Sequence, residues 1–245
     1  MKYLILIILI LQSLLLFSKP KDVFIATGEY PPYTSSEYKN YGFCAEICTE
    51  AFKAVGINTK YVFYPWNRTE NLLKNAKVFA ALPYAKTDER SALYYFSDPI
   101  LDSKALFFYL KDNKKIPDNF AWNSLYDFNP FIMGGILGYW YVDNFEKNKL
   151  NVVYSISDVA NFSNLINRRV DFILITDQVG WHIIRKNLPD HLNKIKTLPK
   201  PESNFPFHLM ISKSYPDYKK LTTEFNRGLK IIKKNGTFAK ISKKY

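Results

Sequence analysis

The sequence of 245 residues contains 34 Lys and Arg against 22 Asp and Glu, which gives a formal net charge of +12. The lysines are spread along the chain rather than gathered into one basic stripe, so we do not expect nucleic acid as a partner. A solvated basic surface is the simplest interpretation, and an anionic membrane surface or an acidic ligand also fits this charge.

The N-terminus has the layout of a secretory signal peptide. Lys2 precedes an apolar run over residues 4–17, and Ser18 and further polar residues follow it. The run is shorter than the ~20 apolar residues that span a bilayer. We therefore expect residues 1–18 to be a cleaved signal peptide and the mature protein to be periplasmic. An uncleaved membrane anchor is the alternative.

Short apolar runs alternate with segments of helical periodicity along the first half of the remaining chain. Two prolines hold residues 29–33 in a loop, and Gly56 ends the first helix. The expected strands are 23–26, 61–64, 78–82 and 105–110, and the expected helices are 42–55 and 66–75.

The same alternation continues in the second half and predicts an α/β fold with mainly parallel sheets. The expected strands are 131–133, 151–154, 172–175 and 207–211, and the expected helices start near Tyr139, cover 158–167 and 178–186, and open a last time at Pro216. Ligands bind at the carboxyl ends of strands in such sheets. The loops to inspect are therefore 27–34, 83–90, 134–139 and 176–180.

The reactive side chains do not form a pattern that indicates an enzyme. Cys44 and Cys48 lie one helical turn apart on an apolar stripe, where a disulfide fits poorly and core packing is expected. His182, His191 and His208 lack the spacing of metal ligands. No nucleophile elbow, P-loop or dinucleotide motif is present. We therefore expect no metal and no cofactor.

Polar and aromatic side chains occupy the strand-end loops. Arg90 offers a planar guanidinium fork for a carboxylate, and Thr87 adds a hydroxyl. Glu29 is the acid of the first loop, and it either binds an ammonium group or is solvated. Aromatic side chains can wall a ligand or cover a cation, and can equally pack in the core. In these loops they are Tyr30, Tyr33 and Trp66.

Six short motifs follow one another in a fixed order. They are Glu29-Tyr30-Pro31-Pro32-Tyr33, Pro65-Trp66-Asn67-Arg68, Thr87-Asp88-Glu89-Arg90, Phe96-Ser97-Asp98-Pro99, Arg168-Arg169-Val170-Asp171 and Asn235-Gly236-Thr237-Phe238. The ordered set resembles the family 3 bacterial extracellular solute-binding proteins, the amino-acid-type periplasmic binding proteins of ABC transporters. Pro-Trp-x-Arg is similar to the signature of one branch. The resemblance covers essentially the whole mature chain.

The resemblance implies a type II periplasmic-binding-protein-like fold, in which two α/β lobes are joined by a two-strand hinge around an interlobe cleft. Lobe 1 would be discontinuous and comprise residues 19–109 plus 208–245. Lobe 2 would comprise residues 110–207. The hinge would lie near residues 110–111 and 205–207.

The resemblance also implies roles for individual residues. Arg90 and Thr87 would hold the α-carboxylate of the ligand, and Tyr84 belongs to the same loop. The Gly138-Tyr139 turn, at an expected helix start, would add backbone amides to that carboxylate.

One ligand contact of the family does not align directly. The acid that grips the α-ammonium falls by spacing on Thr176, with Asp177 one residue further on. Asp177 is therefore the candidate for this contact.

The implied function is capture of a small polar ligand, an amino acid or related carboxylate, for uptake or sensing, without enzymatic activity. A membrane permease complex or receptor would be a separate chain, and the protein would act as a monomer. One alternative is a cyclohexadienyl dehydratase-like lyase on the same fold, with Glu29, Glu46 or Asp177 as acid or base. A stand-alone sensory binding protein is the other alternative.

Overall fold

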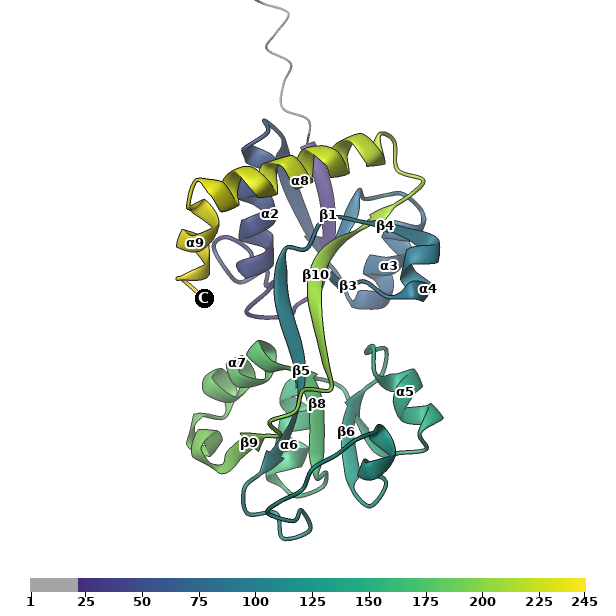
Figure 1. Ribbon diagram of the computed structural model, residues 1–245, viewed down its shortest axis with the longest axis vertical. Coiled ribbons are helices and arrows are strands. Elements are labelled where there is room, and N and C mark those ends of the chain that lie inside the picture. Colours follow the sequence, from purple (N-terminus) through teal and green to yellow (C-terminus); the bar gives the residue numbers. More distant parts are fainter. Residues whose placement is uncertain (1–21) are drawn as a thin grey trace, which may run out of the picture.

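Two long strands, β5 (Leu101–Leu110) and β10 (Ser203–Ser212), connect two α/β lobes in the computed structural model, which describes residues 22–245 (Figure 1). The two strands run antiparallel through the waist, with Ser203 paired to Ala105 and Phe207 paired to Leu101. The expected signal peptide, residues 1–18, lies outside the described residues.

Lobe 1 contains the first strand and the last helix of the described chain. Its elements are β1 (Asp22–Thr27), α2 (Phe43–Lys53), β2 (Asn58–Phe63), α3 (Trp66–Lys74), β3 (Ala80–Ala85), α4 (Asp88–Leu93), β4 (Tyr94–Phe96), α8 (Tyr218–Lys234) and α9 (Thr237–Ser242). Strands β2, β1 and β3 are parallel, and β10 lies antiparallel beside β3. Val23 and Ile25 of β1 pack with α2 and α8, whereas Ala26 packs with α3 on the other face.

Lobe 2 has the same layered plan. Its elements are η1 (Leu125–Phe128), β6 (Ile132–Ile136), α5 (Val142–Lys147), β7 (Asn151–Ser155), α6 (Asp158–Ile166), β8 (Phe172–Thr176), α7 (Asp177–Asn187), η2 (Pro189–Lys194) and β9 (Ile195–Thr197). Strand β6 is parallel to β7 and β8, and β5 closes the sheet antiparallel to β8. Aromatic rings fill the core on one face, where Phe107 stacks on Phe128 and Phe172 meets Phe128 edge to face.

The parallel strands of both lobes end at the waist. Thr27 of β1 and Phe63 of β2 lead into loops that face lobe 2. The loops after Ile136 and Ser155, and the start of α7 directly after Thr176, face lobe 1. The loops that follow the strands of each sheet therefore meet between the lobes, as the α/β rule predicts.

Two helix starts differ from those expected by two residues or more. The helix expected near Tyr139 begins at Val142, because the Tyr139 N–H donates to the Ile136 carbonyl at 3.3 Å and the Tyr141 hydroxyl accepts from the Ile136 N–H at 3.0 Å. These bonds hold the segment in a turn. The last helix begins at Tyr218 rather than Pro216, because Asp217 adopts a left-handed φ of 58° that a helix interior does not allow.

The division of the chain between the lobes, at 109/110 and 207/208, stays a proposal. The strand pairing favours a boundary near the start of β5 for the first passage of the chain from lobe 1 to lobe 2. From Ala105 onward this strand already pairs with β8, and from Phe108 onward with β9, both in lobe 2.

The two cysteines are free and fully buried on α2, which confirms their expected place in the core. Burial raises the pKa of both thiols. Within residues 22–245 no group of three or more His, Cys, Asp or Glu side chains is arranged to hold a metal ion. No helix of these residues combines the length and the apolar character that crossing a membrane requires.

Candidate ligand-binding cleft

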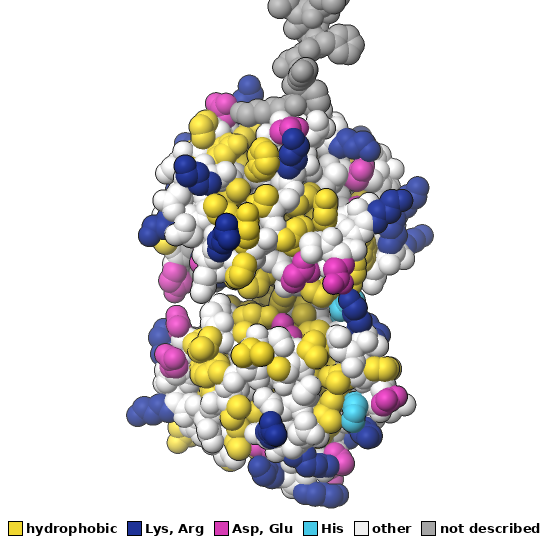
Figure 2. All heavy atoms as spheres, turned by 180° about the vertical axis from the view of Figure 1, so that it is seen from behind, with side chains coloured by type: hydrophobic (Ala, Val, Ile, Leu, Met, Phe, Trp, Pro, Cys, Tyr) yellow, Lys and Arg dark blue, Asp and Glu magenta, His cyan; other side chains and the backbone are white. Residues whose placement is uncertain are grey.

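A cavity of about 480 Å³ lies between the two lobes. Lobe 1 contributes the loops after β1 and β2, and lobe 2 contributes the turn after β6, the start of α6 and one face of α7. Figure 2 shows the narrow waist as a hollow with many hydrophobic side chains. The lining residues that carry polar or aromatic groups are Glu29, Tyr30, Trp66, Asn67, Tyr139, Ser157, Asp158, His182, Lys186 and Asn187. The volume suits a small molecule.

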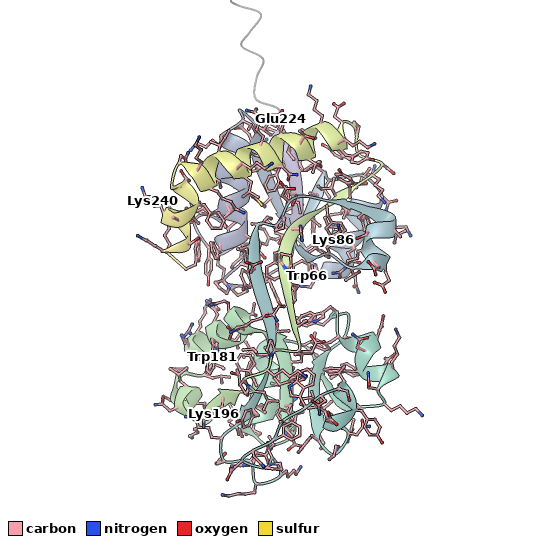
Figure 3. The ribbon with its side chains drawn as sticks, viewed as in Figure 1. Trp66, Lys86, Trp181, Lys196, Glu224 and Lys240 are labelled. Carbon is pink, nitrogen blue, oxygen red and sulfur yellow. The ribbon has the colours of Figure 1, made fainter. Side chains whose placement is uncertain are left out.

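Two aromatic rings form the lobe 1 side of the cavity. The rings of Tyr30 and Trp66 are nearly perpendicular, in edge-to-face contact at a centroid distance of 6.0 Å. Trp66 is the first residue of α3 and lies at the edge of lobe 1 beside the waist (Figure 3). Its ring lies so close to Gly28 that a Cβ there would come within 2.7 Å of it. The glycine at the end of β1 therefore allows the indole to sit at the cleft.

A tyrosine and a carboxylate form a pair on the lobe 2 side. The Tyr139 hydroxyl donates to Asp158 Oδ2 at 2.5 Å. Asp158 is half-buried at the start of α6, directly after the N-cap residue Ser157. Burial raises the pKa of the Asp158 carboxyl from 3.8 to about 6, and the hydrogen bond from Tyr139 opposes the rise.

Among residues 22–245, three polar contacts join the lobes across the waist. The hydroxyls of Tyr30 and Thr176 are 2.5 Å apart, and both side chains are buried. Tyr38 bonds to His182 Nε2 at 3.1 Å. At the surface, Lys186 pairs with Glu37 at 3.2 Å. The lobes therefore touch in this structure and hold the cavity between them.

The expected carboxylate-binding group does not line the cavity. Arg90 lies over the Tyr84 ring at 4.9 Å, donates to the Ala85 carbonyl at 3.2 Å, and lies 3.7 Å from Glu70. Thr87 is the N-cap of α4, where its hydroxyl accepts from the Arg90 N–H. Contacts of Arg90, Thr87 and Tyr84 with a ligand stay predictions.

Most of the other expected site residues line the cavity, and the rest lie toward the hinge. Glu29, Tyr30, Trp66, Gly138 and Tyr139 all line the cavity. The backbone N–H of Tyr139 is already bonded to Ile136, and its hydroxyl is bonded to Asp158.

Two more expected residues lie toward the hinge. Asp177 pairs with Lys104 of β5 at 3.5 Å, and Tyr33 bonds to Ser103 of the same strand at 3.3 Å. Thr176, the other candidate for the ammonium contact, is bonded to Tyr30 instead. A role for Tyr33 or Asp177 in ligand binding stays a prediction.

Asp158 was missed from the sequence, although a signal for it existed. It follows the expected strand 151–154 within a few residues. The rule that ligands bind at the carboxyl ends of strands therefore applies to it as well as to the four expected binding loops. Its bond to Tyr139 joins two loops that periodicity cannot bring together.

The fold and the cavity together define a class of protein, a two-lobed receptor that holds a small molecule between its lobes. The chain belongs to the bacterial extracellular solute-binding proteins, family 3, whose model matches residues 23–245. The assignment to the Pro-Trp-x-Arg branch stays a prediction.

Proteins similar to this chain are named for different ligands. The chain is 25% identical to an arginine-binding periplasmic protein of Mannheimia haemolytica over 93% of this chain and 92% of the relative. The GluR0 ligand-binding core from Nostoc punctiforme, in complex with L-glutamate, has a TM-score of 0.75 at 18% identity and covers 91% of this chain and 98% of its own.

A third relative connects the fold with an enzyme. The ancestral amino acid-binding protein AncCDT-1, a precursor of cyclohexadienyl dehydratase, has a TM-score of 0.73 at 19% identity and covers 91% of this chain and 95% of its own. These likenesses to solved structures establish the fold, and they leave the ligand of this chain open.

Proposed function

We propose that this protein captures an amino acid or a closely related small polar molecule in the interlobe cavity and releases it to a transport or sensing system. The observation that carries the proposal is a cavity of small-molecule size with polar and aromatic groups from both lobes. The arginine-binding relative, which the chain matches over nearly its full length, supports an amino-acid-like ligand.

Binding would act by shifting an equilibrium between open and closed arrangements of the lobes. Two strands connect the lobes, and the cavity takes its walls from both. A ligand that touches both walls binds the closed arrangement better and raises its population. The closed form then presents a surface that the open form lacks, and a membrane partner can recognise it.

The proposed place of action is the periplasm, after removal of residues 1–18. The permease complex or receptor would be a separate chain, and the protein would bind its ligand as a monomer without nucleic acid. The basic surface, with a formal charge of +12 for the whole chain, supports contact with an anionic membrane surface.

A thermal-shift screen of the protein purified from the secreted fraction tests this function. Amino acids, polyamines, sugars and small carboxylates form the panel. A ligand that binds only the folded state raises the melting temperature through mass action. We expect a clear rise with an amino-acid-like compound. No rise with any member of the panel would contradict the proposal.

A lyase is the second candidate function, and one observation favours it. Asp158 faces the cavity with a pKa of about 6, which suits proton transfer near neutral pH. Of the acids expected for a lyase, Glu46 is instead bound by Lys244 and Tyr245 and does not line the cavity. Turnover of prephenate or arogenate would establish the lyase, and we expect none.

A further inference from the structure

Asp158 is a half-buried acid in the cavity wall with no cation beside it. None of the ion pairs among residues 22–245 includes Asp158, and its hydrogen bond comes from the neutral Tyr139 hydroxyl. A carboxylate removed from water is costly unless a positive group or several donors compensate it. The single hydrogen bond leaves Oδ1 without a partner from the protein.

The other charged groups around the cavity do not supply that positive group. Lys186 lines the cavity but is paired with Glu37 at 3.2 Å. His182 is bonded to Tyr38, and burial together with Lys186 and Arg185 lowers its pKa, so it is neutral at pH 7. Glu29 adds a second carboxylate. The wall of the cavity is therefore acidic, although the protein as a whole is strongly basic.

We propose that Asp158, oriented by the Tyr139 hydroxyl, is the anchor for a positively charged side-chain group of the ligand, a guanidinium or a terminal ammonium other than the α-ammonium. The inference rests on the proposed function and narrows it to ligands that carry net positive charge. Asp158 lies on α6, whereas the acid expected from sequence spacing, Asp177, is paired with Lys104 on the hinge strand. The anchor therefore comes from a different element than the sequence predicted.

The surroundings of Asp158 indicate what the cation is attached to. Tyr30 and Trp66 present aromatic rings on the opposite wall, which favour a cation and the methylene chain that carries it. On the lobe 2 rim, Leu137 and Ile156 line the same cavity and are 69% and 98% exposed. A ligand with a charged end and an apolar stem would bury this apolar surface on binding.

Calorimetric titration of the purified protein with a matched set of ligands tests the anchor. The cationic probes are arginine, lysine and agmatine, which is arginine without its carboxylate. The probes without net positive charge are glutamine and glutamate. We expect the cationic probes to bind most tightly. Asp158→Asn should weaken their binding by about 10- to 100-fold, the usual effect of losing a charged hydrogen-bond partner.

The variant is chosen so that a folding defect cannot imitate the result. Asparagine keeps an oxygen that accepts the Tyr139 hydrogen bond. The melting curve of the Asp158→Asn variant reports whether the fold is intact. Asp143→Asn is the matched control, because Asp143 is an exposed acid of lobe 2 that does not line the cavity. The control should bind every probe as the unchanged protein does.

The outcomes separate this inference from the proposed function. Tight binding of glutamine or glutamate with an affinity that Asp158→Asn leaves within about twofold would overturn the anchor and leave the binding function standing. Cationic probes that bind the Asp158→Asn variant as well as the unchanged protein would also overturn it. Absence of binding by every probe, together with no shift in the wider screen, would overturn the binding function and the anchor with it.

Discussion

Burial disfavours the charged form of Asp158, so this residue lowers the stability of the ligand-free fold at neutral pH. Its folded pKa, about 6, lies above the ordinary value of 3.8. Between these values the folded state holds a proton that the unfolded state has lost, so stability falls as pH rises through this window. Above about pH 6 the full cost is present, and below about pH 4 it is absent.

Asp158→Asn should therefore stabilise the ligand-free protein at pH 7. The interval between the two pKa values corresponds to at most about 3 kcal/mol, and we expect a gain on the order of 1–3 kcal/mol. Urea unfolding at pH 7 and at pH 4 measures it, and the gain should vanish at pH 4. A variant that is less stable than the unchanged protein at pH 7 would show that burial does not penalise this carboxylate.

Arg90 provides a residue-scale test of the sequence-based carboxylate contact. If its guanidinium leaves the Tyr84 ring to meet a bound carboxylate, Arg90→Ala should weaken arginine binding by on the order of 2–5 kcal/mol. Agmatine, which lacks the carboxylate, should be unaffected. Titration with both compounds measures the difference. Equal losses of affinity for arginine and for agmatine would show that Arg90 has a structural role only.

At the scale of elements, helices α2 and α8 pack so closely that only hydrogen fits between them at one point. A Cβ on Gly228 would lie 1.9 Å from the Ala51 carbonyl oxygen, a backbone atom that cannot turn aside. Phe225 and Leu229 on either side of this glycine are buried in the shared core. The glycine therefore sets the distance between the two helices.

Gly228→Ala should force the helices apart and destabilise lobe 1. Overpacking of this kind costs about 1–3 kcal/mol, and a backbone clash lies at the upper end. Chemical denaturation measures the loss. Lys230→Ala, at an exposed position of the same helix, should change stability little. Equal stability of the two variants would show that the helices can shift without cost.

The sequence predicted the elements well wherever one helix or strand has a clear pattern. The helix expected at 66–75 is observed as Trp66–Lys74, and the strand expected at 151–154 as Asn151–Ser155. The expected start of α5 near Tyr139 was wrong because the Tyr139 backbone N–H and the Tyr141 hydroxyl are bonded to Ile136, which holds the segment in a turn. A local sequence pattern does not reveal hydrogen bonds of this kind between a turn and the strand before it.

The candidate site was predicted less completely for the same reason. Tyr30 and Trp66 were identified from strand-end loops and do line the cavity. The side-chain partner of Asp158 comes from another loop, and only the folded chain reveals it. The ion pair of Asp177 with Lys104 likewise depends on where the hinge strand runs.

At the scale of the whole molecule, surface charge and cavity charge have opposite signs. The charged side chains that set the net charge are mainly exposed. From this net charge, an acidic ligand was one expectation. The cavity wall, by contrast, holds two acids, Glu29 and Asp158, and one lysine, Lys186, which is paired with Glu37. Net charge therefore informs about the surface that a membrane or a partner meets, and gives no guide to a ligand enclosed between lobes.

The bond between Tyr30 and Thr176 should favour the closed arrangement, because it joins buried hydroxyls of the two lobes. Tyr30→Phe removes this bond and should weaken ligand binding by about 5- to 10-fold. Small-angle scattering of the ligand-free variant should show a larger radius of gyration. Tyr61→Phe is the control, since the Tyr61 hydroxyl donates to the Ala45 carbonyl within lobe 1 and does not line the cavity. A Tyr30→Phe variant with unchanged size and affinity would contradict this role.

Lobe 2 leaves lobe 1 through β5 and returns through the adjacent β10, so it forms one continuous insertion in the chain (Figure 1). The whole segment between these strands can be exchanged for that of a relative by joining the two chains at only two neighbouring points. Such a chimera would keep Tyr30 and Trp66 and replace Asp158 and Tyr139 together. Recombination can thus exchange the lobe 2 wall of the candidate cavity in a single event, while the lobe 1 wall stays unchanged.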